Sequence, residues 1–214
     1  MYQPPHFIET DRETLLGLIR ARPLGLLISA TENGPVADPI PFLLDTDIGE
    51  QGRLRAHVAR ANPQWKLIAS QPEVPVLVVF QGSDAYVTPS WYETKRETGK
   101  VVPTWNYAIV QVRGAARIMD DREWLARQIR DLTASREMQF AEPWAVDDAP
   151  PPFVDAQIKG IVGIEIDILS IDGKWKVSQN RPEADRRGVA AGLDEQPDAA
   201  AMAGLVRKYG KLDG

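Results

Sequence analysis

The chain has 214 residues, a formal net charge of −5 and no cysteine. The absence of cysteine excludes a disulfide framework, a thiolate metal site and a cysteine nucleophile, and two histidines are too few for a multi-histidine metal centre. The acidic balance argues against binding to nucleic acid through bulk charge. The longest apolar run, residues 74–80, is far shorter than a membrane-spanning helix, and the N-terminus lacks the pattern of a signal peptide. We therefore expect a soluble cytoplasmic protein that does not bind membranes.

Turn and capping residues divide the first part of the chain into helices and strands. Thr10-Asp-Arg-Glu13 is a capping box and predicts a helix that ends before Pro23. Asn33-Gly34, between two apolar runs, predicts a β-hairpin. Asn62-Pro63 predicts the start of a short helix. The strands expected here cover residues 24–31, 36–44, 53–58, 74–81 and 85–88, the last two joined by a turn at residues 82–84.

The second part of the chain begins with a long loop over residues 89–104 and a strand over residues 107–119. Apolar residues at helical spacing then predict an amphipathic helix over residues 121–140, and Pro150-Pro-Pro152 interrupts the chain. Alternating isoleucines predict a half-buried strand over residues 161–171, which a turn at Asp172-Gly173 joins to a strand over residues 174–178. The remainder is helical in pattern.

Strands joined by hairpins, with helices inserted between them, predict an antiparallel sheet that closes on itself. The chain is therefore expected to be mainly β, a small barrel with peripheral α-helices. A parallel doubly wound fold is disfavoured, because strands and helices do not alternate and no G-x-G-x-x-G sequence is present.

The first polar cluster lies where the strand over residues 53–58 leads into the short helix. It contains Arg60, Asn62, Gln64, Trp65 and Lys66. Amide groups at a helix N-terminus, together with two cations, suit a phosphate group. The alternative is an ordinary strand–helix corner, with Trp65 in the core and the cations in solvent.

The second cluster surrounds the long loop and includes Ser90, Trp91, Trp105 and Asn106. Its aromatic side chains could line a planar ligand while the hydroxyl and amide groups orient it. Alternatively, the aromatic residues cover the end of the barrel or a subunit interface. The loop itself is either a lid over a substrate, with Tyr92 or Tyr107 as proton donor, or an arm that contacts a second subunit.

The third cluster follows Gly173. Alternation along a strand places Lys174, Lys176 and Ser178 on one face, and Gln179 and Arg181 follow directly. Two lysines, a hydroxyl, an amide and a guanidinium suit a phosphate or another acidic group. A solvated face after a glycine turn is the alternative.

Several motifs together resemble the PaiB family of FMN-binding negative transcriptional regulators. They are Met-Tyr-x-Pro-x-His-Phe at residues 1–7, Ala-Arg-Ala-Asn-Pro-Gln-Trp at 59–65, Tyr-Val-Thr-Pro-Ser-Trp-Tyr at 86–92, Val-Pro-Thr-Trp-Asn-Tyr at 102–107 and Lys-x-Ser-Gln-Asn-Arg at 176–181. The resemblance implies an antiparallel split β-barrel of the pyridoxamine-phosphate-oxidase type, which holds FMN at the interface of a homodimer. It covers a domain of residues 1–193 and leaves residues 194–214 as a helical tail.

The resemblance implies that the three clusters contact FMN, so the expected cofactor-binding residues are Arg60, Asn62, Gln64, Trp65, Lys66, Ser90, Trp91, Trp105, Asn106, Lys176, Ser178, Gln179 and Arg181. No catalytic or metal-binding residue is assigned. Residues 181–211 mix basic and acidic side chains and contain no recognition helix, so regulation through DNA or through a protein partner stays open. The alternatives to a regulator are a flavin-dependent oxidoreductase and, with His57 or His6 as ligand, a haem-binding split barrel.

Overall fold

The computed structural model describes residues 1–212, which form two compact units. Unit 1 contains Met1–Leu18, Gln81–Val110 and the residues from Asp172 onward, and unit 2 contains Ile19–Phe80 and Gln111–Ile171. Three long strands contribute residues to both units. Among residues 1–212, no helix combines the length and the apolar character that crossing a bilayer requires.

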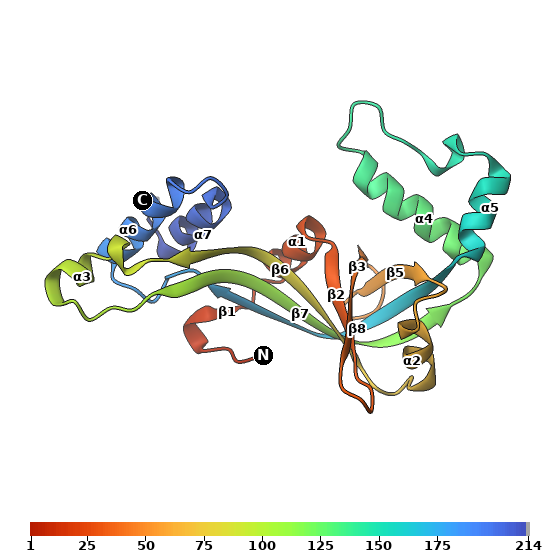
Figure 1. The fold of residues 1–214 in the computed structure, drawn as a ribbon, viewed down its shortest axis with the longest axis horizontal. Coiled ribbons are helices and arrows are strands. Elements are labelled where there is room, and N and C mark those ends of the chain that lie inside the picture. Colours follow the sequence, from red (N-terminus) through yellow and green to blue (C-terminus); the bar gives the residue numbers. More distant parts are fainter. Residues whose placement is uncertain (213–214) are drawn as a thin grey trace. The chain divides into compact units, whose positions relative to one another are not determined.

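The elements are drawn in Figure 1. The strands are β1 (Ile8–Glu9), β2 (Leu24–Ser29), β3 (Val36–Pro41), β4 (Leu43–Asp45), β5 (Arg53–Ala59), β6 (Val76–Val87), β7 (Thr104–Met119) and β8 (Ile161–Lys176). The α-helices are α1 (Arg12–Ala21), α2 (Gln64–Ser70), α3 (Glu93–Thr98), α4 (Arg122–Glu137), α5 (Pro151–Lys159), α6 (Glu183–Asp194) and α7 (Ala200–Gly210). Short 3₁₀ helices are η1 (Pro5–Phe7), η2 (Pro89–Trp91) and η3 (Val146–Asp148).

The strands form one sheet in the order β3-β2-β6-β7-β8-β5-β4, and β1 pairs with β8. The pairings of β2 with β3 and β6, of β4 with β5, and of β5 with β8 are antiparallel. The sheet order begins at β3 and ends at β4, and only Phe42 separates these two strands in the chain. The sheet therefore closes on itself, which confirms the predicted antiparallel split barrel with peripheral helices. Pro39 and Pro41 lie in β3, at one end of this order, where a missing N–H group is tolerated.

Alternation along the strands separates an apolar interior from a charged exterior in unit 2. Leu54 and Ala56 of β5 are fully buried, as are Ile164 and Ile166 of β8. The residues between them carry charges, and the register pairs Arg53 with Asp167 and Arg55 with Glu165. Helix α4 packs over this charged face: Trp124 fits against Gly163, where an added Cβ would lie 2.1 Å from the indole ring.

The turns predicted at residues 82–84 and 172–173 are wrong, because β6 and β8 continue through these positions as unbroken strands. A Cβ on Gly82 would lie 2.8 Å from Leu18 Cδ1, and one on Gly173 would lie 2.0 Å from Leu15 Cδ2. Both glycines are therefore explained by close packing against the N-terminal segment of unit 1. The sequence alone presents them as turn residues, since glycine is typical of turns as well.

The helix boundaries also differ in places. The N-cap of α1 is Asp11 and not Thr10, because the Asp11 carboxylate accepts a hydrogen bond of 2.9 Å from the Thr14 amide. The predicted loop over residues 89–104 contains η2 and α3, and the three prolines after residue 149 precede or begin α5. The predicted helical tail forms α7, which packs against α6. Its boundary at residue 193 stays a prediction, and its last residues, 213–214, lie outside the described part.

Candidate functional site

The third predicted cluster forms a basic segment in unit 1, residues 174–181. Lys174 and Lys176 lie on the same face of β8, with their Nζ atoms 5.3 Å and 6.0 Å from the centre of the Tyr107 ring. Lys176 donates to Thr104 Oγ1 and to the Trp105 carbonyl. Within the described chain, no carboxylate forms an ion pair with Lys174, Lys176 or Arg181.

The three cations of the basic segment influence each other. Burial lowers the pKa of Lys176, and the charges of Lys174 and Arg181 lower it further. Lys174 is 7% exposed and donates to the Tyr2 carbonyl at 3.0 Å. Three cations held close together without a counter-charge attract an anion, because the anion would relieve their mutual repulsion.

The turn that follows β8 is held rigidly. Ser178 has a φ of 66°, in the left-handed region that a side chain disfavours by about 1–2 kcal/mol. Its hydroxyl pairs with the buried Asn106 amide at 2.9 Å and 3.2 Å. Gln179 closes the turn, accepting from the Val177 amide at 2.8 Å and donating to the Trp175 carbonyl at 2.5 Å. Ser178 thus lies in this turn and not on the strand face predicted for it, and the Gln179 side chain is engaged with the backbone.

The aromatic residues of the second cluster divide into a covered and an open group. Trp91 is half-buried against α6, where a Cβ on Gly188 would lie 1.9 Å from its carbonyl oxygen and one on Gly192 would lie 2.2 Å from its ring. Tyr92 is 1% exposed, and the Arg181 guanidinium lies 4.7 Å from its ring centre. Burial raises the pKa of Tyr92, although the Arg181 charge opposes the shift.

Trp105 belongs to the open group. It is 54% exposed and meets Tyr86 edge to face at 6.0 Å. Together with Tyr107 and Asp84 it lines a cavity of about 250 Å³. Ser90 is exposed and accepts from Lys95 at 3.1 Å. The open aromatic surface next to the Lys176 ammonium could therefore receive a planar ligand that carries an anionic group.

The first cluster lies in unit 2, where Arg60 and Asn62 are engaged with neighbouring groups but the buried Gln64 Oε1 has no hydrogen-bond partner in the described chain. Arg60 forms a two-bond pair with Asp120 and also donates to the carbonyls of Lys159 and Ile161, each at 2.9 Å. The hydrogen bonds and charge of Arg60 lower the pKa of Asp120. Arg60 thus joins three segments of unit 2, and a phosphate could bind to its guanidinium only by replacing Asp120.

The other members of the first cluster support the same corner. Asn62 donates to Asp38 and accepts from the Gln64 amide, both at 2.8 Å. The N-cap of α2 is Pro63, one residue later than the predicted cap at Asn62. Gln64 is fully buried and donates to the Leu27 carbonyl at 3.0 Å. Trp65 donates to the Arg60 carbonyl at 3.0 Å, while Lys66 is exposed.

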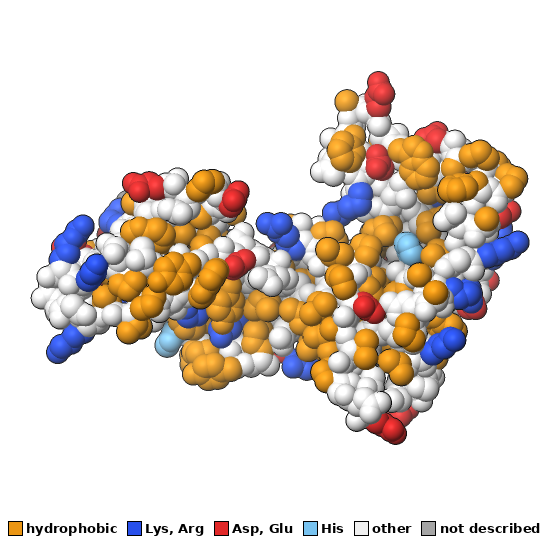
Figure 2. Space-filling model, in the orientation of Figure 1, with side chains coloured by type: hydrophobic (Ala, Val, Ile, Leu, Met, Phe, Trp, Pro, Cys, Tyr) orange, Lys and Arg blue, Asp and Glu red, His pale blue; other side chains and the backbone are white. Residues whose placement is uncertain are grey.

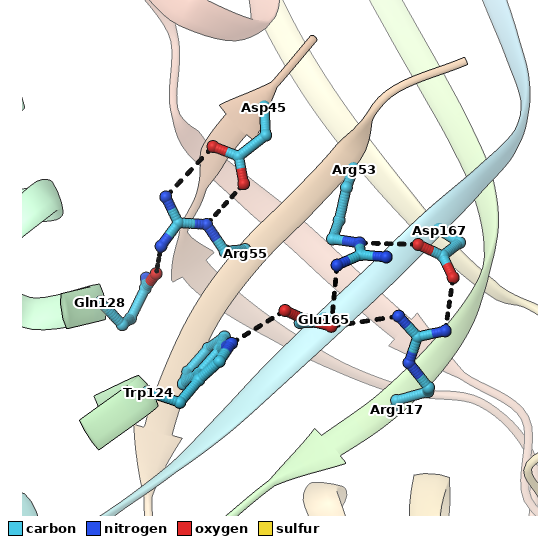
Figure 3. Close-up of polar contacts among 8 residues, drawn as sticks. All are labelled: Asp45, Arg53, Arg55, Arg117, Trp124, Gln128, Glu165 and Asp167. Carbon is cyan, nitrogen blue, oxygen red and sulfur yellow. Dashed lines mark hydrogen bonds and ion pairs between the residues drawn. The ribbon is translucent and has the colours of Figure 1, made fainter. Parts of the chain in front are cut away.

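Sequence reasoning missed a charged network on the outer face of unit 2, shown in Figure 3. Glu165 is 7% exposed and accepts from the Trp124 indole at 2.8 Å, from Arg117 at 3.1 Å and from Arg53 at 3.2 Å. Burial opposes ionisation of Asp167, but Arg53 and Arg117 together lower its pKa. The signal was present in the alternation of arginines on β5 and carboxylates on β8, although only their register shows that they pair.

Beside this network lies a cavity of about 580 Å³, lined by residues that include Asp45, Arg55, Trp124 and Asp131. Arg55 pairs with both aspartates. His57 follows on the same face of β5; its Nδ1 atom is buried without a hydrogen-bond partner in the described chain, and burial lowers its pKa.

The sequence matches known proteins over most of its length. Residues 1–170 match the family model described as "Putative FMN-binding domain". A protein of Emericella nidulans is 39% identical, with 99% of this chain and 98% of that protein covered. "Protease synthase and sporulation protein PAI 2" of Bacillus subtilis is 31% identical, with 96% of each chain covered. Among solved structures, the flavocytochrome Anf3 from Azotobacter vinelandii has a TM-score of 0.55 at 16% identity, over 79% of this chain and 69% of that one, which shows a common fold.

Proposed function

We propose that this protein, which belongs to the FMN-binding family matched by its residues 1–170, is a homodimeric flavoprotein. In the same proposal it acts as a negative transcriptional regulator. FMN, predicted from the sequence motifs, is accordingly its cofactor. The regulatory part of the proposal is supported by the PaiB-type motifs and by similarity to the Bacillus subtilis sporulation protein over 96% of both chains. The cytoplasm is the compartment we propose for it.

The observation that carries the placement of FMN is the unpaired basic segment beside an open aromatic surface. FMN consists of a planar ring system and a phosphate, and the residues of unit 1 fit both parts. Lys176 and Arg181 would bind the phosphate, Trp105 would contact the ring system, and the Asn106–Ser178 pair would fix the turn between them. When bound, FMN supplies an isoalloxazine ring that can exist in oxidised and reduced forms.

The corner at Arg60 is the second candidate for the phosphate. Its guanidinium binds a carboxylate through two parallel hydrogen bonds, an arrangement that also suits phosphate oxygens. In a homodimer, the corner of one subunit and the basic segment of the other could share one FMN molecule. In this arrangement, the residues that shape the corner are Asn62, Gln64, Trp65 and Lys66.

Affinity measurements with FMN and riboflavin test the placement. Lys176→Met removes one charge-assisted bond to phosphate, so FMN should bind about 10–150-fold more weakly, which corresponds to about 1.5–3 kcal/mol. Riboflavin lacks the phosphate, so its affinity should change less than about twofold. Lys100→Met removes an equal charge from an exposed position in the same unit and should leave both affinities unchanged. Equal losses for FMN and riboflavin would contradict a phosphate contact, and a loss in Arg60→Ala alone would assign the phosphate to the corner.

The regulatory role needs its own measurements. Light scattering should give a dimer at micromolar concentration, burying more than about 1,000 Å² in total. Reporter assays should show repression, and gel-shift assays test whether the protein binds DNA directly. The flavin-loaded protein should oxidise NAD(P)H only slowly. Lid movement of residues 89–104 would break the bonds of 2.9 Å from the Thr94 amide and hydroxyl to the buried Asp185. Rapid, saturable NAD(P)H oxidation would instead favour the oxidoreductase, and a monomer would remove the interfacial flavin site.

A further inference from the structure

The helical insertion between β7 and β8 contains an apolar pocket of about 320 Å³. It lies between the C-terminal half of α4 and the segment that returns along this helix, residues 143–147. Its apolar lining comprises Thr133, Ala134, Met138, Pro143, Trp144 and Val146. Figure 2 shows hydrophobic side chains gathered over α4 and α5, at the upper right. This pocket contains none of the residues proposed to bind FMN.

The returning segment is fixed at both ends, so the pocket is a built feature. The Trp144 amide donates to the Glu137 carboxylate at 3.0 Å, and Arg130 pairs with Asp147 at 3.2 Å. The Ala145 amide donates to Asp148 at 2.8 Å, which starts η3, and Val146 is 6% exposed. These anchors hold the segment beside α4 while leaving space between them.

The charges at the rim indicate what the pocket accepts. Arg130, Glu137 and Asp147 reach its lining, but each is engaged with a neighbour in the bonds just described. A charged ligand would have to break one of these pairs and lose its own hydration. An uncharged ligand gains the apolar contacts without that cost. Met138 is 79% exposed and Trp144 is 48% exposed, and both are residue types that adapt well to flat apolar molecules.

We infer that this pocket binds a small, uncharged, apolar molecule, with Trp144 and Met138 contacting its faces. The volume is at the lower end of the range for small-molecule sites, which limits the ligand to about two or three rings. Since α4 also carries Gln128 and Asp131, which bind Arg55 of β5, a ligand in the pocket contacts a helix that is fixed to the barrel. The inference is independent of the proposed regulation and of FMN binding.

Two fluorescent probes of matched shape test the inference on the flavin-loaded, full-length protein. Phenylnaphthylamine is uncharged, and anilinonaphthalene sulfonate has the same ring framework with an added sulfonate. The uncharged probe should bind saturably and at least about tenfold more tightly than the sulfonate. If the sulfonate binds equally well or better, Arg130 is accessible to anions and the inference of an uncharged ligand is wrong.

Two variants at one position locate the binding. Ala134 lines the pocket and is exposed, so Ala134→Phe fills the pocket without disturbing a packed core, whereas Ala134→Ser keeps its volume. Ala134→Phe should weaken phenylnaphthylamine binding at least about tenfold, and Ala134→Ser less than about twofold. Unchanged binding in Ala134→Phe overturns the assignment. No binding to the parent protein, together with a change in molecular mass by light scattering in Ala134→Phe, would show that a second copy of the chain covers the pocket.

Discussion

Glu165→Gln should destabilise unit 2 more than the matched change at Asp167, its neighbour in the charged network. The carboxylate is 7% exposed and accepts from Trp124, Arg53 and Arg117. Glutamine keeps the shape but has one acceptor oxygen, so its amide group must face a donor. Losing one charge-assisted bond and leaving one buried donor unpaired costs about 2.5–6 kcal/mol together. The Arg117 side chain is 51% exposed, so solvent compensates part of this and we expect about 3 kcal/mol.

Urea unfolding and scanning calorimetry of the full chain measure this loss. For a chain of this size, 3 kcal/mol lowers Tm by about 6–12 °C. Asp167→Asn is the matched control, because Asp167 pairs with the same two arginines but its side chain is 37% exposed. It should cost less than about 1 kcal/mol. A loss in Glu165→Gln no larger than that in Asp167→Asn would refute the reasoning from burial.

Three further changes test other parts of the structure. Gly192→Ala places a Cβ 2.2 Å from the Trp91 ring, so it should lower the free energy of unfolding by about 1–3 kcal/mol and alter the near-ultraviolet circular dichroism spectrum. Gly204→Ala has open space at its Cβ and should stabilise α7 by up to about 1 kcal/mol. Equal effects of the two changes would contradict the packing of Trp91 against α6. Burial lowers the pKa of His57, so below about pH 6.5 the unfolded state binds more protons than the folded state. The free energy of unfolding should therefore decrease as the pH is lowered from about 7 to about 5, and His57→Leu should make this decrease smaller. The pKa of Asp167 is also lowered, so its stabilisation is present above the unfolded value near 3.9 and is lost as the pH falls through the lower folded value; an acid titration should be less steep in Asp167→Asn, and an unchanged titration would show that its arginine partners contribute nothing.

The sequence by itself determined the elements that local chemistry specifies. Asn33-Gly34 predicted the hairpin between β2 and β3, where Gly34 has a φ of 107° and Thr31 bonds to it in both directions. Asp121 lies at the predicted start of α4 and accepts from the Trp124 amide at 2.8 Å. Alternation of apolar and charged residues predicted which side chains of β5 and β8 face the interior, but residues 162–166 of β8 are buried on both faces and not half-buried, because α4 covers the charged face. These features depend on a few neighbouring residues, so they can be read without a fold.

The family motifs also led to FMN, and the strand alternation correctly placed Lys174 and Lys176 together. The sequence does not show whether these cations already have a carboxylate partner or are free to bind an anion. Lys176 and Arg181 lack a carboxylate partner in the described chain, whereas Arg60 of the first cluster is paired with Asp120, sixty residues later. Equivalent residue types thus differ in availability, because long-range pairing decides which charges are already satisfied.

Only the tertiary structure decided where glycines and aromatic residues serve packing. Gly82 and Gly173 are typical turn residues but lie within the continuous strands β6 and β8. Glycine is needed there because side chains of the N-terminal segment lie where a Cβ would be. Trp91 belongs to a motif that suggests a ligand-binding wall, yet its ring packs against Gly192 of α6. A local sequence pattern specifies which backbone conformations a segment can adopt. Which side chain packs against a given glycine depends on the segment that the fold brings next to it, and for Trp91 that segment is about one hundred residues away along the chain.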